Sequence, residues 1–380
     1  MWRLLAVELG AFGFFGLWAG CFAVLLADLS RALDLSPGPL GVALFAGAAA
    51  SILAMAALGW TADRLGRRAY LVAVSLVFGL GIIGVAFANG YAMLLAALIV
   101  LYSATGLYDV GINAAAVDLE KTSGRRFMAL LHAAFSSGGV AGALTAGALL
   151  QAGTYYSYVY LMLLAPLTVV MLAVSLTRFP VPEPHVGGTE KARGLYRSLP
   201  LLLVAAIATL GMLSEGEMEH WSGIYLRQTL ELSALLGGSG VAVFYGAMAV
   251  GRLGATWTIS RFGDRRTLLG AGLLTTLGMA LALATHWPLI VVAGFLVVGL
   301  ALSSVVPIAF SVAGDLAPGR AGAAISVVTT LGYGGFLLGP VIVGGLAELL
   351  GLRIALATIA VAGVVISTLA LRVGGRPTRL

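Results

Sequence analysis

The sequence predicts an all-α membrane protein of twelve transmembrane helices, arranged as two related six-helix halves with both termini in the cytoplasm. Hydrophobic residues fill 60% of the 380 positions and charged residues only 10%, whereas a soluble domain carries about 25% charged residues. The charges cluster in short runs between apolar stretches, each about 20 residues long, which is the length that crosses a hydrocarbon core. Because exposing this much apolar surface to water is energetically unfavourable, we expect a multi-pass protein with the lipid bilayer as its partner.

Twelve apolar spans follow one another along the chain, and the longest break separates six from six. The first six lie at 3–27, 39–60, 69–88, 91–117, 128–150 and 155–177. The second six lie at 199–226, 234–259, 267–285, 288–313, 321–345 and 352–373. The break at 178–198 contains three prolines and several charges. It predicts a cytoplasmic linker between an N-terminal bundle, 1–177, and a C-terminal bundle, 199–380.

The distribution of Lys and Arg sets the expected orientation. With the N-terminus in the cytoplasm, 18 of the 22 basic residues fall in inside segments, and only Arg31, Arg227 and Arg353 fall outside. Such asymmetry is the usual topology signal of membrane proteins. It also accounts for the net charge of +6 without nucleic acid, because these charges face anionic lipid and the cytoplasm. We therefore expect the protein to reside in the cell membrane, which in a bacterium is the inner membrane.

The two halves repeat in sequence. Arg64-x-Gly66-x-Arg68 recurs as Arg261-x-Gly263-x-Arg265, and the same offset carries Asp118 onto Asp315. Each aspartate lies at the predicted cytoplasmic end of the fourth span of its half. Two parallel six-span halves are one of the known repeat designs of secondary transporters.

The loop between spans 2 and 3 carries the most specific motif of the chain. It reads Gly59-Trp60-Thr61-Ala62-Asp63-Arg64-Leu65-Gly66-Arg67-Arg68. This loop resembles the Gly-x-x-x-Asp-Arg-x-Gly-Arg-Arg signature of the major facilitator superfamily, and every fixed position matches. The resemblance implies a secondary active transporter with the fold already predicted.

The residues of this loop are suited to tight turns, close helix crossings and ion pairs. Gly66 permits a tight turn that a Cβ would hinder, and Gly59 allows two helices to cross closely. Asp63 can accept hydrogen bonds, and the arginines can pair with acids such as Asp118 and Glu120. The resemblance implies that this network holds the halves in one of two access states. We expect the same role for the second copy of the loop, and for Arg252 as the structural partner of that copy. The alternative is that these residues only anchor the protein to lipid headgroups.

A second, narrower resemblance covers spans 4 and 5. The segments Gly106-Leu107-Tyr108-Asp109-Val110-Gly111-Ile112-Asn113 and His132-Ala133-Ala134-Phe135-Ser136-Ser137-Gly138-Gly139 are similar to the branch of that family that contains the fucose–proton symporter. This resemblance implies that Asp109 carries the proton and that Asn113 contacts the substrate.

Ionisable residues inside a span are costly and mark function by default. Asp109 lies near the middle of span 4, and Asn113 shares its helix face one turn later. We predict a proton carrier with a substrate-binding amide, against a buried structural pair. His132 opens span 5, where it could relay protons or cap the helix. Glu8 in span 1 is close enough to the predicted interface to extend toward it.

Span 7 carries an unusual acidic cluster at Glu215, Glu217 and Glu219, followed by His220 and Trp221. Glu215 lies just outside the centre of the span, and the repeat offset places it opposite Trp18. We predict that Glu215 binds substrate or a proton and that Trp18, Tyr108 and Trp221 contact the substrate. Glu219 and His220 could instead reach external water.

The sequence predicts neither enzyme chemistry nor a cofactor. It contains no Gly-x-x-x-x-Gly-Lys-Ser/Thr loop for nucleotides, and its four histidines lack metal-ligand spacing. With one cysteine, Cys21, an internal disulfide is excluded. The expected partners are a small-molecule substrate and protons, and we expect a monomer.

The functional prediction is alternating-access uptake of a small polar solute such as a sugar, coupled to protons. Two interpretations stay open beside it. Acids together with aromatic rings also suit lipophilic cations, as in a proton antiporter that exports drugs or metabolites. A membrane sensor that binds a ligand without moving it is the third.

Overall fold

The computed structural model describes residues 1–179, 192–317 and 320–373. In the first half the helices are α1 Trp2–Ala32, α2 Pro37–Leu58, α3 Thr61–Leu65, α4 Arg67–Ala86, α5 Tyr91–Ser123, α6 Met128–Gln151, α7 Tyr156–Met162 and α8 Leu164–Ser175. In the second they are η1 Ala192–Arg197, α9 Leu199–Ile224, η2 Tyr225–Thr229, α10 Ala234–Leu283, α11 Pro288–Leu302, α12 Val305–Leu316, α13 Ala321–Leu350, α14 Leu352–Ala355 and α15 Ala357–Ala370.

The described helices contain twelve stretches that are long and apolar enough to cross a membrane. This confirms the predicted helix number and fold class. Some spans consist of two labelled helices, as α7 and α8 together form one span. The long helix α10 instead supplies two spans, and it bends at Gly263. Large apolar side chains cover much of the outside, for example Leu53 at 68% and Leu253 at 69% exposed. Lipid accounts for that exposure, because hydrocarbon is the solvent of these faces.

Local sequence explains where several helices begin and end. Pro37, Pro200 and Pro288 each stand in the first turn of a helix, where the missing N–H removes no hydrogen bond. Gly124 ends α5 with φ of 65°, the left-handed conformation that favours glycine at a helix C-terminus.

The chain divides into two compact units, which are described separately here. One holds Met1–Val186 with Leu232–Ala242, and the other holds Gly187–Glu231 with Val243–Leu380. The beginning of α10 joins the first unit because a Cβ at Gly238 would lie only 2.7 Å from the Ala143 carbonyl oxygen of α6. The linker predicted at 178–198 remains a prediction, since residues 180–191 lie outside the described residues.

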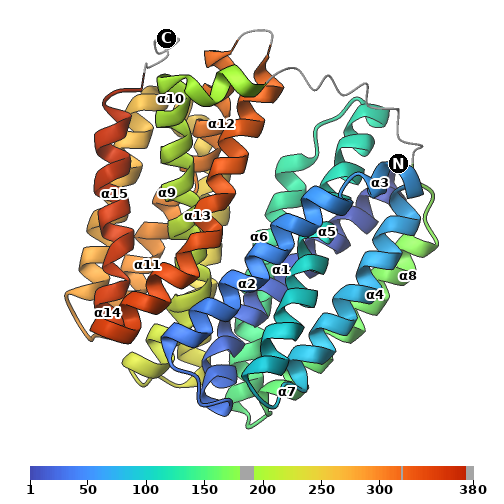
Figure 1. Ribbon diagram of the computed structural model, residues 1–380, viewed down its shortest axis with the longest axis vertical. Helices are drawn as coiled ribbons and strands as arrows, with labels where there is room; N and C mark the ends of the chain where they lie inside the picture. The colour runs from blue at the N-terminus through green and yellow to red at the C-terminus, as the bar shows by residue number, and fades with distance from the viewer. Residues whose placement is uncertain (180–191, 318–319, 374–380) are drawn as a thin grey trace. The chain divides into compact units, whose positions relative to one another are not determined.

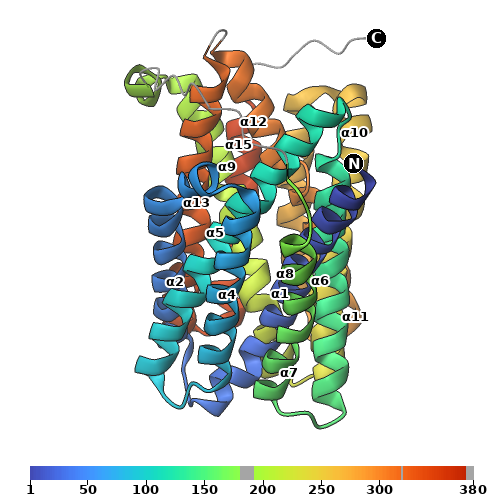
Figure 2. The same ribbon diagram turned by 90° about the vertical axis from the view of Figure 1, so that its right-hand side faces the viewer.

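In the first unit, α2 and α4 pack along α5, and α1 packs along the whole of α6. Figure 2 shows α2, α4 and α5 as one group of helices, with α1, α6 and α8 as another. In the second unit α13 packs along α9, and α12 and α15 flank α9 as well. Figure 1 shows α9, α13 and α15 running alongside one another.

The α1–α6 contact is a glycine crossing. A Cβ on Gly16 or Gly20 of α1 would collide with backbone atoms of Phe135 or Gly139 on α6, and one on Gly142 of α6 would collide with the Leu17 carbonyl. Small residues let helices approach until their backbones touch, which drives helix association in lipid. The same kind of packing occurs in the second unit, for example where Gly335 of α13 lies against the Thr209 carbonyl of α9.

We predict that Gly142→Ala destabilises the fold by about 1–3 kcal/mol, because its methyl group overlaps the Leu17 carbonyl in a packed interface. The measurement is the apparent melting temperature of the purified protein. Gly270→Ala is the control, since a Cβ at Gly270 meets nothing within 4 Å and alanine favours the helix. Equal melting temperatures for the two variants would contradict the glycine crossing.

Candidate functional site

Asp109 and Asn113 form a bonded pair on one face of α5. The Asn113 side-chain amide donates to Asp109 Oδ1 at 2.8 Å and to the Asp109 carbonyl at 2.9 Å. Both side chains are half-buried. The four-residue spacing brings them together within the helix, so the two side chains share one helix face as the sequence indicates. A carboxyl with a single amide donor keeps free lone pairs for a proton or a solute hydroxyl.

The glycines beside this pair position α5. A Cβ at Gly106 would overlap Ser51 of α2, and one at Gly111 would meet Leu71 2.6 Å away on α4. Both helices therefore press directly against the α5 backbone next to Asp109. The pair lies on a segment that two neighbouring helices hold in place.

An aromatic cluster fills the interior of the first unit around α1. Phe15 stacks on Trp18 with 5.8 Å between ring centroids, and it also contacts Tyr108 and Phe135. Trp18 and Tyr108 are 7% and 1% exposed, so they pack within the core of this conformation. Phe15 and Phe135 are the half-buried rings among these four. The sequence analysis missed Phe15, since in an apolar span nothing distinguishes one phenylalanine from another.

His132 and Glu8 also lie in this unit. The His132 ring meets the edge of Phe12 with 5.4 Å between centroids, and His132 is half-buried at the beginning of α6. The expectation that Glu8 reaches the interface is wrong. Glu8 is 0% exposed, and neither carboxyl oxygen has a hydrogen-bond partner among the described residues, because α1 lies packed along α6.

In the second unit, Glu215 of α9 pairs with Arg252 of α10. Arg252 Nη2 lies 2.9 Å from Glu215 Oε1, and the side chains are 31% and 21% exposed for Arg252 and Glu215. The acid that the structure places on Arg252 is the predicted cavity residue, and the assignment of Arg252 to the second loop stays a prediction. One turn beyond, Glu219 accepts a hydrogen bond from the Tyr245 hydroxyl at 3.0 Å. The α9–α10 face thus carries a half-buried ion pair and a second bonded acid.

Trp221 does not share this face. Its side chain is 0% exposed, and its indole N–H lacks a partner among the residues described. The structure gives Trp221 a packing position in this conformation, and its predicted contact with substrate stays a prediction. Helical periodicity already separated it from Glu215, because residues six apart point in different directions.

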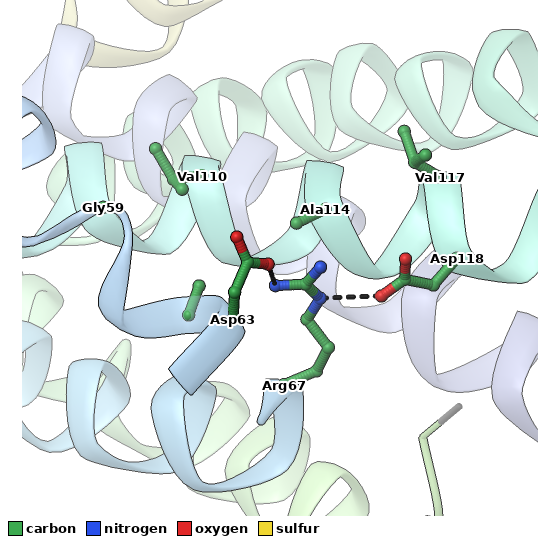
Figure 3. Close-up of a pocket in the computed structure, with 8 residues that line it drawn as sticks. Gly59, Asp63, Arg67, Val110, Ala114, Val117 and Asp118 are labelled. Carbon is green, nitrogen blue, oxygen red and sulfur yellow. Dashed lines mark hydrogen bonds and ion pairs between the residues drawn. The ribbon is translucent and has the colours of Figure 1, made fainter. Parts of the chain in front are cut away.

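Three residues of the predicted latch form an ion-pair network around Arg67. Its guanidinium bonds Asp63 Oδ1 at 2.6 Å and Asp118 Oδ2 at 2.7 Å, and Figure 3 shows it between the two carboxylates. The Arg67 side chain is 1% exposed, that of Asp118 is 7% and that of Asp63 is 50%. The network therefore ties the turn before α4 to α5 within one unit.

A cavity of about 180 Å³ lies beside this network. It is lined by Gly59, Ala62, Asp63, Arg67, Val110, Ala114, Val117 and Asp118. Valine and alanine form much of its wall, and the charged groups that face it are already bonded to one another (Figure 3).

The other loop arginines have different surroundings. Arg64 and Arg68 are exposed, and the Arg64 guanidinium stacks over the Trp60 ring at 5.7 Å. The prediction that Glu120 pairs with a loop arginine is wrong: its carboxylate accepts from the backbone N–H groups of Phe127 and Met128 and so caps α6.

The second loop repeats the backbone of the first. Gly66 and Gly263 have φ of 78° and 77°, a left-handed conformation that favours glycine. Arg261 and Arg265 are exposed. The offset that relates the halves places Asp264, 3% exposed, where the first half has Arg67. The two loops thus share a turn but differ in the charge of the residue that follows its glycine, and the latch role of the second copy stays a prediction.

We predict that Arg67→Ala lowers the stability of the protein by about 3–5 kcal/mol, because it leaves the Asp118 carboxylate buried without its cation. The neighbouring exposed Arg68→Ala is the matched control and should change stability by no more than about 0.5 kcal/mol. Chemical or thermal unfolding of both purified variants makes the comparison. Equal losses would show that the arginines act only as basic anchors.

Known protein sequences match this chain over most of its length. The sequence profile of the Major Facilitator Superfamily matches residues 9–258 and 224–379. An uncharacterized MFS-type transporter of Yersinia pestis is 32% identical over 357 residues, which cover 92% of this chain and 90% of that protein. The membrane protein MosC of Rhizobium meliloti is 29% identical over 369 residues, with coverage of 96% and 89%.

Solved structures agree on the fold. The nucleoside transporter NupG, in a mutant form, aligns with a TM-score of 0.83 at 14% identity and covers 98% of this chain and 99% of its own. A D-xylose–proton symporter aligns with a TM-score of 0.76 at 14% identity, with coverage of 98% and 97%. From the profile match over nearly its whole length, the chain belongs to the Major Facilitator Superfamily and is a multi-pass membrane transporter.

Proposed function

We propose that this transporter takes up a small polar, neutral solute such as a sugar, coupled to protons, by alternating access. The observation that carries the proposal is the Asp109–Asn113 pair, a half-buried carboxyl bonded to one amide on α5. The names of the aligned structures add no argument on the solute, because likeness at 14% identity supports the fold alone.

Asp109 can exchange one proton without losing its partner. As a carboxylate it accepts the Asn113 N–H, and as an acid it keeps a carbonyl acceptor and gains an O–H donor. A solute hydroxyl can therefore receive a hydrogen bond from the acid and donate one to the Asn113 side-chain oxygen. Proton and solute would stabilise the same state, and a ligand shifts a conformational equilibrium only through such differential affinity.

The second unit supports a neutral solute. The positive charge of Arg252 faces the carboxylate of Glu215 at 2.9 Å, so the pair presents no net charge. Hydroxyl groups of a solute can bond to either half of a half-buried ion pair without replacing it. We propose Glu215 as a substrate contact and as a second proton-coupling group.

We also propose an oligomeric state, a membrane and an orientation for this transporter. It works as a monomer in the cell membrane, which in a bacterium is the inner membrane, and both termini lie in the cytoplasm. The asymmetry of Lys and Arg between alternate segments supports this orientation. It also implies that the Arg67 network faces the cytoplasm and can act as a latch between access states.

A proton antiporter that exports lipophilic cations is the second candidate, and Phe15 favours it. This half-buried ring forms the edge of an aromatic cluster with Trp18, Tyr108 and Phe135, and aromatic faces attract cations. The two candidates differ in the direction of coupling. A proton gradient directed inward drives accumulation by a symporter and expulsion by an antiporter.

The solute class is tested by a thermal-shift screen of the purified protein with neutral sugars, amino acids and lipophilic cations. We expect a sugar to stabilise the protein, by about 2.7 kcal/mol at a hundred times its dissociation constant. Asn113→Ala should abolish that shift while leaving the unliganded protein folded. Stabilisation by cations alone would favour the exporter instead.

Proton coupling is tested by Asp109→Asn in proteoliposomes loaded with the solute found in the screen. We expect the variant to lose accumulation driven by a proton gradient but to retain counterflow exchange, since its amide keeps the shape of the acid and cannot exchange a proton. Asp34→Asn is the control, because Asp34 is exposed and its φ of 50° suits asparagine. Full accumulation by Asp109→Asn would overturn the assignment.

A further inference from the structure

Glu217 is a buried acid that the proposed transport site does not use. It lies on α9 with 0% exposure, two residues from Glu215 and on another face of the helix. Its Oε2 atom lies 3.0 Å from the Thr358 hydroxyl of α15, and its Oε1 atom has no hydrogen-bond partner among the residues that the structure describes. A carboxylate with one neutral donor and no cation is costly at such a position.

The Thr358 hydroxyl is shared between two acceptors. Its oxygen lies 2.6 Å from the Ala355 carbonyl as well as 3.0 Å from Glu217. A hydroxyl has one proton to donate, and the carbonyl, which can only accept, is the nearer of the two oxygens. When that proton bonds the carbonyl, the Thr358 oxygen can join Glu217 only by accepting a hydrogen bond from a carboxylic acid.

The internal repeat shows that a buried acid is not required by the packing. The offset that carries Arg64 onto Arg261 carries Gly20 onto Glu217 and Gly142 onto Gly339. In the first unit the helices touch at these positions, and a Cβ on Gly142 would collide with the Leu17 carbonyl. In the second, a Cβ on Gly339 would stand 3.4 Å from the Leu213 carbonyl and 3.5 Å from Glu217 Cγ.

Space for the acid comes from a wider helix crossing. Pro340 follows Gly339 inside α13 and removes a backbone hydrogen bond there, which bends helices. The second unit thus holds a carboxyl side chain where the first holds a glycine.

Among the described residues of the second unit, Glu217 has no bonded cation. The ionisable residues with described side chains on α9 and on the elements around it are Glu215, Glu219, His220, Tyr225, Arg227, Tyr196, Arg197, Tyr245, Arg252, Arg261, Asp264, Arg265, Arg266, Asp315, Tyr333, Glu348 and Arg353. The sequences of α11 and α15 contain none. Within the described parts of the chain, none of these residues bonds to Glu217.

We infer that Glu217 is a proton-binding site of the second unit, in which the neutral acid joins α9 to α15 through Thr358. Loss of the proton would place a carboxylate in a site with no donor, so proton release requires that α9, α13 and α15 separate enough to admit water. The site thereby links proton occupancy to the packing of these helices. It stands whether or not Asp109 couples transport to protons, since it needs neither a solute nor a gradient.

Infrared spectroscopy of the full chain in lipid nanodiscs at neutral pH tests this site. We expect a carbonyl band of a protonated carboxyl in the unmodified protein and its loss in Glu217→Gln. Thr358→Val should keep the band but move it to higher frequency, because the acid loses its acceptor. Glu231→Gln is the control, since Glu231 is exposed and lies outside the buried site.

A second measurement uses the sign of the pH effect on stability. The folded protein holds a proton at Glu217 that the water-exposed unfolded chain releases, so this contribution to stability falls as the pH rises. Raising the pH should lower the apparent melting temperature of the unmodified protein more than that of Glu217→Gln. If Glu217→Gln does not fold, the band shift in Thr358→Val decides.

Two results would overturn the inference: a protonated-carboxyl spectrum that is identical with and without Glu217, or a Glu217 band that Thr358→Val leaves in place. Asp109→Asn separates this inference from the proposed function. That variant should lose driven accumulation and keep the Glu217 band, so either proposal can fail while the other stands.

Discussion

Hydrocarbon offers no hydrogen bonds, so each polar group within the helices must find its partner inside the protein or become neutral. Arg67 meets this requirement with two carboxylates, and Arg252 meets it with Glu215. Within the part of the chain that the structure describes, Glu217 has no bonded cation and contacts a threonine hydroxyl. Some buried ionisable groups are thus specifically paired, whereas Glu8 and Glu217 are not paired with a cation. They are also the places where a proton or a solute can change the energy of one conformation relative to another.

The two halves show how one backbone design supports different chemistry. Gly66 and Gly263 make the same left-handed turn, yet the next residue is a buried arginine in one half and a buried aspartate in the other. The first unit joins α1 to α6 through touching glycines, whereas the second admits Glu217 between α9 and α13. Such differences within a repeat give a transporter separate sites on a common scaffold.

Acidic groups on α5 and α9 differ in the kind of partner they have, and their expected roles differ accordingly. Asp109 bonds to an amide one turn away, so its partner moves with it when the helix moves. Glu215 and Glu217 bond to residues of other helices, α10 and α15. Interactions between helices can break when those helices separate, whereas an interaction within one helix persists. In this arrangement α5 is suited to bind, and α9 is suited to report conformational change.

The sequence by itself determined the twelve spans, the repeated loop and the Asp109–Asn113 pair. Hydropathy is a local property, and residues four apart on a helix meet without help from the rest of the fold. Only the tertiary structure decided that Arg67 rather than Arg64 joins Asp118, that Arg252 bonds Glu215, and that Trp221 and Glu8 are buried. Those outcomes depend on which helix faces which and at what distance. The pattern along a single apolar helix does not contain that information, because lipid-facing and protein-facing sides are equally hydrophobic.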